Sequence, residues 1–185
     1  ASAPPAAAPI PLRNSMENPM HAMPWTRSYP AALHWDAPIP LRAVQSILDD
    51  AVARWPDQPA IDFMGKVITY REFGALVDKA AKGLQLLGVG PDVHVGLFLA
   101  NTPHYMIGFF AVLKAGGVVV NYSPLDAQQV LAHKVEDSQT DLMITQDLAL
   151  LYRQMDKLLT GTRLKTLVVG NLGEMSAHPA GVTAH

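Results

Sequence analysis

Apolar side chains recur at helical spacing around residue 50 of the chain. In 41–55 they would line one face of a helix, and Pro56 would end it, because a proline ring clashes with the preceding turn. The pattern therefore predicts an amphipathic helix here. Its apolar positions are Val44, Ile47, Leu48, Ala51, Val52 and Trp55.

A β-hairpin is predicted directly after this helix. Two short apolar runs, 60–63 and 67–70, flank the Met64-Gly65-Lys66 segment. Runs of this length on either side of a short glycine-containing segment are typical of two antiparallel strands joined by a tight turn.

A second helix has signals at both of its ends. Thr69 and Glu72 have the spacing of a capping box, in which each side chain binds the backbone amide of the other residue. Apolar residues at helical spacing follow as far as Leu87. Gly88 comes next and suits a helix end, where a residue with positive φ is usually needed.

Strands and helices alternate through the rest of the chain, and the strands are apolar throughout. Such strands indicate a parallel sheet whose two faces are both covered by helices. We therefore expect an α/β fold with a mostly parallel sheet, preceded by a helix and a hairpin. The predicted strands are 93–99, 118–121, 142–145 and 166–169, and the predicted helices are 102–115, 126–137 and 147–159.

Three features refine these helices. Pro103 suits a first helical turn, because its missing N–H would be unpaired there, and Gly116-Gly117 would end that helix. Asp126 is the predicted N-cap of the next helix. The side chains expected to point inward from that helix are those of Val130, Leu131 and Val135.

The two ends of the chain differ from this middle. Residues 1–24 form a lead-in rich in proline and alanine that we expect to be irregular, since proline supplies no amide hydrogen. The α/β domain is expected over 25–171, and 172–185 reads as a small, polar tail without a pattern. No signal peptide is recognised. The apolar stretch 105–120 is shorter than a membrane span and is expected to be a buried helix followed by a buried strand.

Composition excludes several classes of function. Hydrophobic residues make up 49% of the 185 residues and charged residues 16%, so the chain can bury a sizeable core. The net charge of −2 gives no basic excess for nucleic acid. No cysteine is present, which removes disulfides, Cys-ligated zinc and thiol nucleophiles.

Common catalytic and binding motifs are missing from the chain. Gly88 and Gly90 would end a helix and precede a strand, the reverse of a dinucleotide-binding turn. The sequence has no P-loop, no zinc-binding His spacing and no nucleophile elbow. His104 and His133 are interpreted as structural residues. The lysines at 79, 82 and 114 are interpreted as solvated helix positions.

Polar residues follow each predicted parallel strand. Ligands of open parallel sheets collect beyond the carboxyl ends of the strands, so this edge is where a site is expected. Taken singly, each residue is more simply a helix cap than a ligand contact. The four segments are Asn101-Thr102-Pro103, Asn121-Tyr122-Ser123-Pro124, Thr145-Gln146 and Gly170-Asn171.

Read in order, a series of short blocks resembles the start of an AMP-forming acyl-CoA synthetase of the adenylate-forming superfamily. The resemblance covers about residues 25–171. The Tyr29-Pro30 pair and the Val-Asn-x-x-Pro-Leu segment at 120–125 look most like bacterial long-chain fatty acid–CoA ligases. The other blocks are 55–60, 68–73, 87–95, 100–103, 113–125 and 133–138.

The resemblance implies an enzyme that joins a fatty acid to CoA, with ATP and Mg²⁺ as cofactors, through an acyl-adenylate. This chain would be the N-terminal subdomain, without cofactors and inactive alone, because the family's phosphate loop ending in Pro-Lys-Gly does not occur in it. No catalytic or metal-binding residue is therefore assigned. Asn121, Tyr122 and Ser123 are similar to a loop near the CoA passage of relatives and are the candidate ligand-proximal residues.

Several properties stay open at this point. The resemblance implies a cytoplasmic enzyme, and it admits a homodimer and peripheral association with the inner face of the membrane. The same beginning would fit an acyl-AMP ligase or an aryl-acid ligase. A stand-alone, non-catalytic α/β binding or assembly module is the remaining alternative.

Overall fold

The computed structural model describes residues 25, 28–33 and 37–179. The chain divides into two compact units, Ala1–Leu41 and Arg42–His185. In the first unit the backbone turns, and the amide of Leu33 donates to the carbonyl of Pro30 at 2.9 Å. The prediction for residues 1–24 lies outside the described residues. The second unit begins at Arg42, whereas the sequence pattern placed the start of the domain at residue 25.

The second unit opens with the predicted helix, hairpin and capped helix. The capping box is confirmed: Thr69 Oγ1 accepts from the Glu72 amide, and the Glu72 carboxylate accepts from the Thr69 amide at 2.8 Å. Gly88 has a φ of +90°, as a helix end requires. The elements are α1 (Ser46–Arg54), the antiparallel strands β1 (Pro59–Phe63) and β2 (Lys66–Thr69), and α2 (Tyr70–Leu86).

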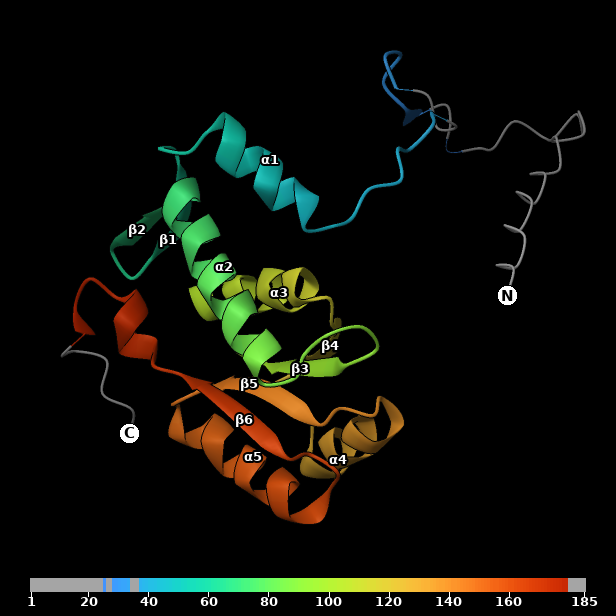
Figure 1. Ribbon diagram of the computed structural model, residues 1–185, viewed down its shortest axis with the longest axis vertical. Helices are drawn as coiled ribbons and strands as arrows, with labels where there is room; N and C mark the ends of the chain where they lie inside the picture. The colour runs from blue at the N-terminus through green and yellow to red at the C-terminus, as the bar shows by residue number, and fades with distance from the viewer. Residues whose placement is uncertain (1–24, 26–27, 34–36, 180–185) are drawn as a thin grey trace, which may run out of the picture. The chain divides into compact units, whose positions relative to one another are not determined.

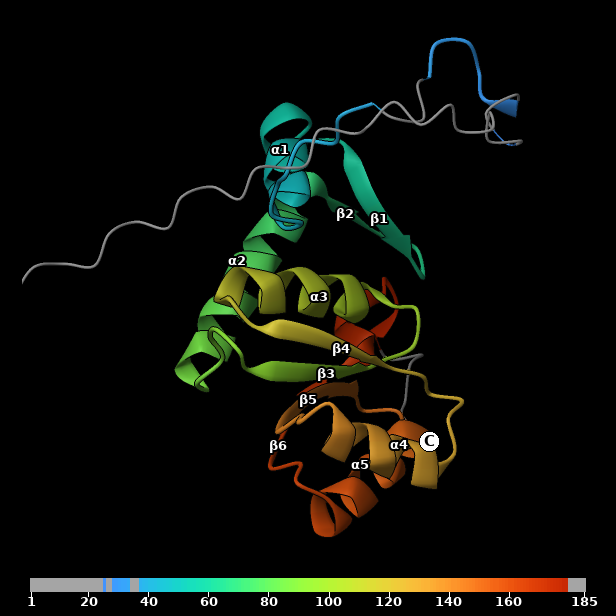
Figure 2. The ribbon, with the colours of Figure 1, turned by 90° about the vertical axis from the view of Figure 1, so that its right-hand side faces the viewer.

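A four-stranded parallel sheet follows, with the strand order β4-β3-β5-β6. Helices α2 and α3 lie on one face of it, and α4 and α5 lie on the other (Figures 1 and 2). This arrangement confirms the predicted fold class. The elements are β3 (His94–Phe98), α3 (Pro103–Ala115), β4 (Val118–Tyr122), α4 (Gln128–Asp137), β5 (Leu142–Gln146), α5 (Ala149–Gly161) and β6 (Thr166–Gly170).

The sheet separates two apolar clusters. One joins α2 and α3 to the sheet through residues such as Val77, Leu97 and Val112, and the other joins α4 and α5 through residues such as Leu131 and Met155. Every residue of β5 is buried, whereas β4 and β6 are only partly buried. The expectation of uniformly buried strands is wrong for these two, because within the described residues they form the edges of the sheet.

The apolar face predicted for the first helix is largely uncovered. Leu48 is buried against α2, but the side chains of Val44, Ile47 and Trp55 are exposed. Among the described residues of its unit, α2 is the helix on which α1 mainly packs, so one side of the apolar face of α1 stays exposed.

Three further side-chain predictions are wrong. Asp126 does not cap α4: its carboxylate pairs with Lys134 Nζ at 2.5 Å, and α4 has no side-chain cap. Val130 is exposed on α4, whereas Leu131 and Val135 are buried as expected. Lys114 is not a freely solvated lysine, because it bridges acidic residues of α1 and α2.

The segment after β6 also differs from the patternless tail that was expected. A short 3₁₀ helix, η2, runs from Leu172 to Met175, and Met175 belongs to the apolar cluster beneath α2 and α3. Lys66 Nζ donates to the carbonyl of Glu174 at 2.6 Å, and the Ala177 amide donates to the carbonyl of Met64 at 3.3 Å. This segment is therefore held against the hairpin.

The apolar stretch 105–120 forms α3, the turn after it and the start of β4, so the predicted helix and strand are present, but the strand is only partly buried. None of the helices in the described ranges combines the length and apolar character that crossing a membrane would require.

Candidate functional site

The parallel arrangement brings the four polar strand ends to one edge of the sheet. Gln146, the last residue of β5, is fully buried and links two of them. Its Nε2 donates to Thr102 Oγ1 at 2.9 Å and lies 3.4 Å from His104 Nδ1. The ends of β3 and β5 are thus joined by side chains, as the sheet geometry predicted.

His104, in the first turn of α3, lies between β5 and β6. In the tautomer with its hydrogen on Nε2, His104 Nδ1 accepts a hydrogen bond from the Gln146 amide nitrogen. Burial lowers the pKa of His104, while the nearby charges of Glu174 and Asp147 and the Asn171 backbone act in the opposite direction without reversing it. The ring is therefore neutral near pH 7.

Glycine at the end of β6 makes room for this ring. A Cβ at Gly170 would lie 2.6 Å from His104 Cδ2, a distance that real side chains do not tolerate. The next residues close the same corner, since the Asp147 amide donates to the Gly170 carbonyl at 3.0 Å and Asp147 Oδ1 accepts from the Leu172 amide at 2.9 Å. The carboxyl ends of β5 and β6 are fixed by these contacts.

The sequence-predicted candidates lie at the same edge, on β4 and the loop after it. Asn121 is exposed, and its Oδ1 accepts a hydrogen bond from the Tyr105 hydroxyl at 2.9 Å. Ser123 is half-buried and its Oγ accepts from the Leu125 amide at 3.2 Å. Neither bond uses every polar atom of the two side chains, so both residues can contact a ligand.

Tyr122 has a different environment. Its ring is buried against α4, and its hydroxyl lies 2.8 Å from Ser138 Oγ and 2.9 Å from Thr140 Oγ1. Alternation of side chains along a strand explains this, because Tyr122 points to the opposite face of the sheet from Asn121. The Tyr122 side chain therefore stabilises the core and does not face the edge.

The expectation that strand-end polar residues act as helix caps is wrong for α3, α4 and α5. None of these three helices has a side-chain cap. Thr102 occupies the N-cap position of α3, but its hydroxyl accepts from Gln146 instead. The Thr102 hydroxyl thus joins the start of α3 to the end of β5, two elements that are distant in sequence.

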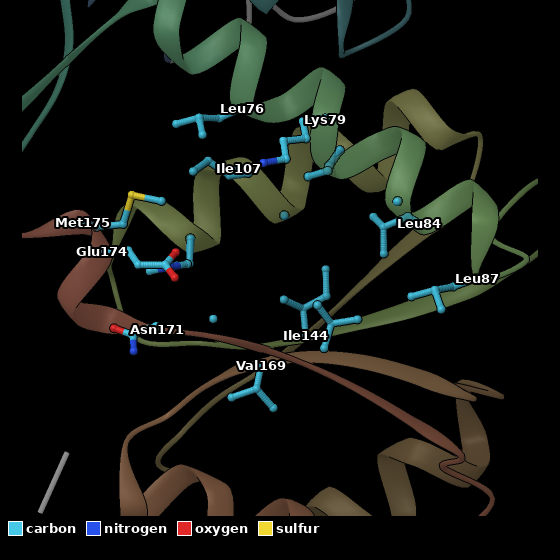
Figure 3. Close-up of a pocket in the computed structure, with 17 residues that line it drawn as sticks. Leu76, Lys79, Leu84, Leu87, Ile107, Ile144, Val169, Asn171, Glu174 and Met175 are labelled. Atoms are coloured by element: carbon cyan, nitrogen blue, oxygen red, sulfur yellow. The ribbon is translucent and has the colours of Figure 1, made fainter.

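Two hollows flank the start of α3. One, of about 350 Å³, is lined by Asn101, Thr102 and Tyr105 together with Asp62 of β1. The other, of about 460 Å³, lies between α2, α3 and β6 and has mostly apolar walls, with Lys79, Asn171 and Glu174 among its polar residues (Figure 3).

ATP and Mg²⁺ would require a phosphate-binding loop and a group of side chains that can hold a metal ion. Within residues 25, 28–33 and 37–179, no three His, Asp or Glu side chains are grouped so that they could hold a metal ion. The sequence also has no glycine-rich phosphate loop. The residues present therefore do not fit the nucleotide phosphates or their metal, and no catalytic step is assigned to this chain.

Comparison with known proteins identifies the family. Residues 48–179 match the family described as AMP-binding enzyme. The chain belongs to this family. The predicted kinship with the adenylate-forming enzymes is thereby confirmed.

Two relatives show which members of the AMP-binding family it resembles. A long-chain-fatty-acid–CoA ligase of Bacillus subtilis is 38% identical over 125 residues, which cover 68% of this chain and 22% of the relative. Zwittermicin A synthase ZmaJ of Bacillus cereus is 34% identical over 115 residues, which cover 62% of this chain and 22% of that protein. The chain thus spans about a fifth of each.

Solved structures agree with the fold. The crystal structure of a long-chain-fatty-acid-CoA ligase from Archaeoglobus fulgidus superposes with a TM-score of 0.65 at 21% identity. The match covers 74% of this chain and 30% of that protein. The α/β architecture of this AMP-binding family member is therefore that of the corresponding part of an adenylate-forming enzyme.

Sequence reasoning found the edge but not its central residues. Gln146 was placed at a strand end without a role, and His104 was interpreted as structural. Gly170 gave a faint signal as a glycine at a strand end, where a close approach by a ring is one reason for glycine. The contact itself joins His104 and Gly170, two residues that are 66 positions apart in the sequence.

Proposed function

We propose that the chain is the N-terminal part of an AMP-forming fatty acid–CoA ligase. In the first half-reaction a carboxylate oxygen attacks the α-phosphorus of ATP, which gives acyl-AMP and pyrophosphate. In the second the CoA thiol attacks the acyl carbon, which gives the thioester and releases AMP. A carboxylate needs this activation because AMP is a far better leaving group than oxide.

The observation that supports the fatty acid class is the 38% identity to the Bacillus subtilis ligase, the highest of the identities reported above. The residues of this chain would contribute binding and support. We propose that Asn121 and Ser123 approach the ligand from the carboxyl edge, with Gln146 and His104 holding that edge in place. ATP and its Mg²⁺ would be held by residues outside this chain.

A second candidate is the activation of an amino acid or an aryl acid, and the identity to a natural-product synthase favours it. The two candidate functions differ in the class of carboxylic acid that the enzyme activates. We also propose that the whole enzyme acts in the cytoplasm, with membrane association and dimer formation as properties to be measured on it.

The experiment uses the whole enzyme, expressed from the reading frame that contains these residues. Pyrophosphate release is measured with long-chain fatty acids, aryl acids and amino acids, each with and without CoA. We expect release that depends on a fatty acid, and AMP with acyl-CoA only when CoA is present. Pyrophosphate release with amino acids or aryl acids, and none with fatty acids, would contradict the proposal. The chain of 185 residues is the matched control and should release no pyrophosphate.

A further inference from the structure

The hydroxyl of Tyr105 joins helix α3 to the end of strand β4. It donates to Asn121 Oδ1 at 2.9 Å, across 16 positions of sequence. Helix α3 lies along β4 (Figure 2), and the ring of Tyr105 packs on the apolar cluster beneath α2 and α3. The bond therefore connects a ring that the core holds to an exposed side chain at the edge of the sheet.

The backbone of Asn121 is held on both of its flanks. Within the described residues β4 is an edge strand, and Asn121 pairs in register with Leu97 of β3. The next residue, Tyr122, is anchored on the opposite face, where its hydroxyl lies 2.9 Å from Thr140 Oγ1. The sheet thus sets the position of the Asn121 side chain, and the bond from Tyr105 sets the rotation of its amide.

The bond between Tyr105 and Asn121 adds little to the stability of the fold. Asn121 is exposed, and a hydrogen bond that replaces bonds to water has a small net effect. Holding an exposed asparagine also removes side-chain freedom, which opposes folding. A side chain that is fixed without benefit to the fold points to a ligand, because a preorganised group loses no further freedom when it binds.

The same bond determines which atoms of Asn121 face outward. Oδ1 accepts from Tyr105, and because the amide is planar its Nδ2 lies on the other side. No residue in the described part of the chain accepts a hydrogen bond from Nδ2. Two N–H donors are thus presented at the carboxyl edge, where ligands of parallel sheets collect. Such donors suit an oxygen acceptor, for example a carbonyl or a phosphate oxygen.

We propose that Tyr105 is a positioning residue for ligand binding, which holds Asn121 with its Nδ2 donors toward an oxygen acceptor of the ligand. The inference rests on the proposed function, which places Asn121 at the ligand. Tyr105 does not touch the ligand and acts only through residue 121. CoA, ATP and the carboxylic acid all carry oxygen acceptors, and the experiment separates them.

The test is a double-mutant cycle in the whole enzyme with Tyr105→Phe and Asn121→Ala. Calorimetry gives the dissociation constants of CoA, ATP and the acid. Tyr105→Phe should weaken the binding of one ligand about threefold, because the amide can then turn. In the Asn121→Ala background the same substitution should change nothing, since the side chain that Tyr105 holds is absent. Tyr70→Phe is the matched control, because its ring packs on the same apolar cluster, and it should bind like wild type.

Asn121→Asp tests the direction of the amide. It keeps an oxygen for the Tyr105 hydroxyl but replaces the Nδ2 donors with a second, charged acceptor. Affinity for the same ligand should therefore fall at least about tenfold, the effect of roughly one hydrogen bond. The thermal midpoints of all these variants should stay within about 2 °C of wild type, since the bond is exposed.

The alternative outcomes have distinct meanings. Additive losses from Tyr105→Phe and Asn121→Ala would show that Tyr105 acts elsewhere and would overturn the proposal. So would unchanged dissociation constants in Tyr105→Phe, or wild-type affinity in Asn121→Asp. The ligand whose constant changes is the one that carries the acceptor. A whole protein that gives the expected cycle but releases no pyrophosphate with any acid would contradict the proposed function and leave this inference standing.

Discussion

The imidazole ring of His104 packs directly on Gly170, so closely that a Cβ at residue 170 would lie 2.6 Å from Cδ2 of the ring. Helix α3 and strand β6 thereby meet at the carboxyl edge of the sheet. Gln146 holds the other side of the ring. The edge is therefore a packed joint between elements as well as a polar surface.

Gly170→Ala should disturb this joint. The methyl group would push the ring of His104 away from Gln146, and we expect the free energy of unfolding to fall by about 1–3 kcal/mol, as for other overpacked sites. Gly90→Ala is the control, because a Cβ there meets nothing within 4 Å. Chemical denaturation gives both values. His104→Ala should make the substitution at 170 nearly neutral, and a persistent loss in the double variant would show that the ring is not the cause.

The half-buried ring of His104 should make the stability of the protein depend on pH. The pKa of His104 is lowered in the folded protein, chiefly by burial, so the unfolded chain binds a proton more readily. Its contribution is present above the ordinary pKa of about 6.5 and is lost as the pH falls through the lower, folded pKa. Wild type should therefore lose more stability between pH 7.5 and pH 5.5 than His104→Gln.

Denaturation curves at the two pH values test this, and His133→Gln, at an exposed position of α4, is the control that should behave like wild type. Nuclear magnetic resonance titration of the His104 ring gives the pKa directly. A value at or above that of an exposed histidine would contradict the prediction.

Lys114 of α3 ties together the first three helices. Its Nζ lies 2.9 Å from Asp49 of α1 and 2.5 Å from Asp78 of α2. Partial burial lowers the pKa of Lys114, but the bonds to Asp78 and Asp49 outweigh this and raise it above its ordinary value. Because both carboxylates are largely exposed, the interaction is weakened by solvent and salt.

Lys114→Met keeps most of the apolar stem and removes the charge. We expect a loss of about 0.5–1 kcal/mol at low salt, the range of exposed pairs, and a smaller loss in 1 M salt. Hydrogen exchange of the α1 amides should quicken, because this contact helps to hold α1. Lys82→Met on the exposed side of α2 should change neither property, and a salt-independent loss at residue 114 would point to packing instead.

Asn121 provides a test of the carboxyl edge in the whole enzyme. Asn121→Ala removes an exposed amide that a ligand could contact, so kcat/KM should fall about tenfold, the effect of roughly one hydrogen bond, with little change in the thermal midpoint. Tyr105→Phe removes the hydroxyl that donates to Asn121 but leaves the Asn121 amide in place, so its kcat/KM is the value for comparison. Equal activity of Asn121→Ala and wild type would remove residue 121 from the site.

Two local signals at the ends of α2 were predicted correctly because their physics is local, whereas the N-cap predicted at Asp126 was not, since that carboxylate pairs with Lys134. The capping box of Thr69 and Glu72 and the positive φ of Gly88 involve residues within one helical turn, and both were predicted correctly. The alternation of apolar runs and helical patterns likewise determined the α/β class, since an apolar strand needs cover on both faces. The sequence also placed the polar edge, because the carboxyl ends of parallel strands must meet.

The tertiary structure decided which side chains are used at that edge. Asn121 and Tyr122 are neighbours in sequence, but one is exposed and the other is buried against α4, and this depends on which strand face the helix covers. The same holds for Val44 and Ile47 of the first helix, whose apolar pattern is regular although they are exposed. Periodicity reports which residues share a face, whereas burial depends on what packs against that face.

Contacts between distant elements could not be read from the chain. His104 needed the glycine at 170 and the amide of Gln146 at the same point in space, and Lys114 needed carboxylates from two other helices. The sequence by itself determined the elements, their order and the edge where a ligand is expected. Only the tertiary structure decided the partners of each polar side chain, because hydrogen bonds and ion pairs act over a few ångströms between residues that the fold, and not the sequence, brings together.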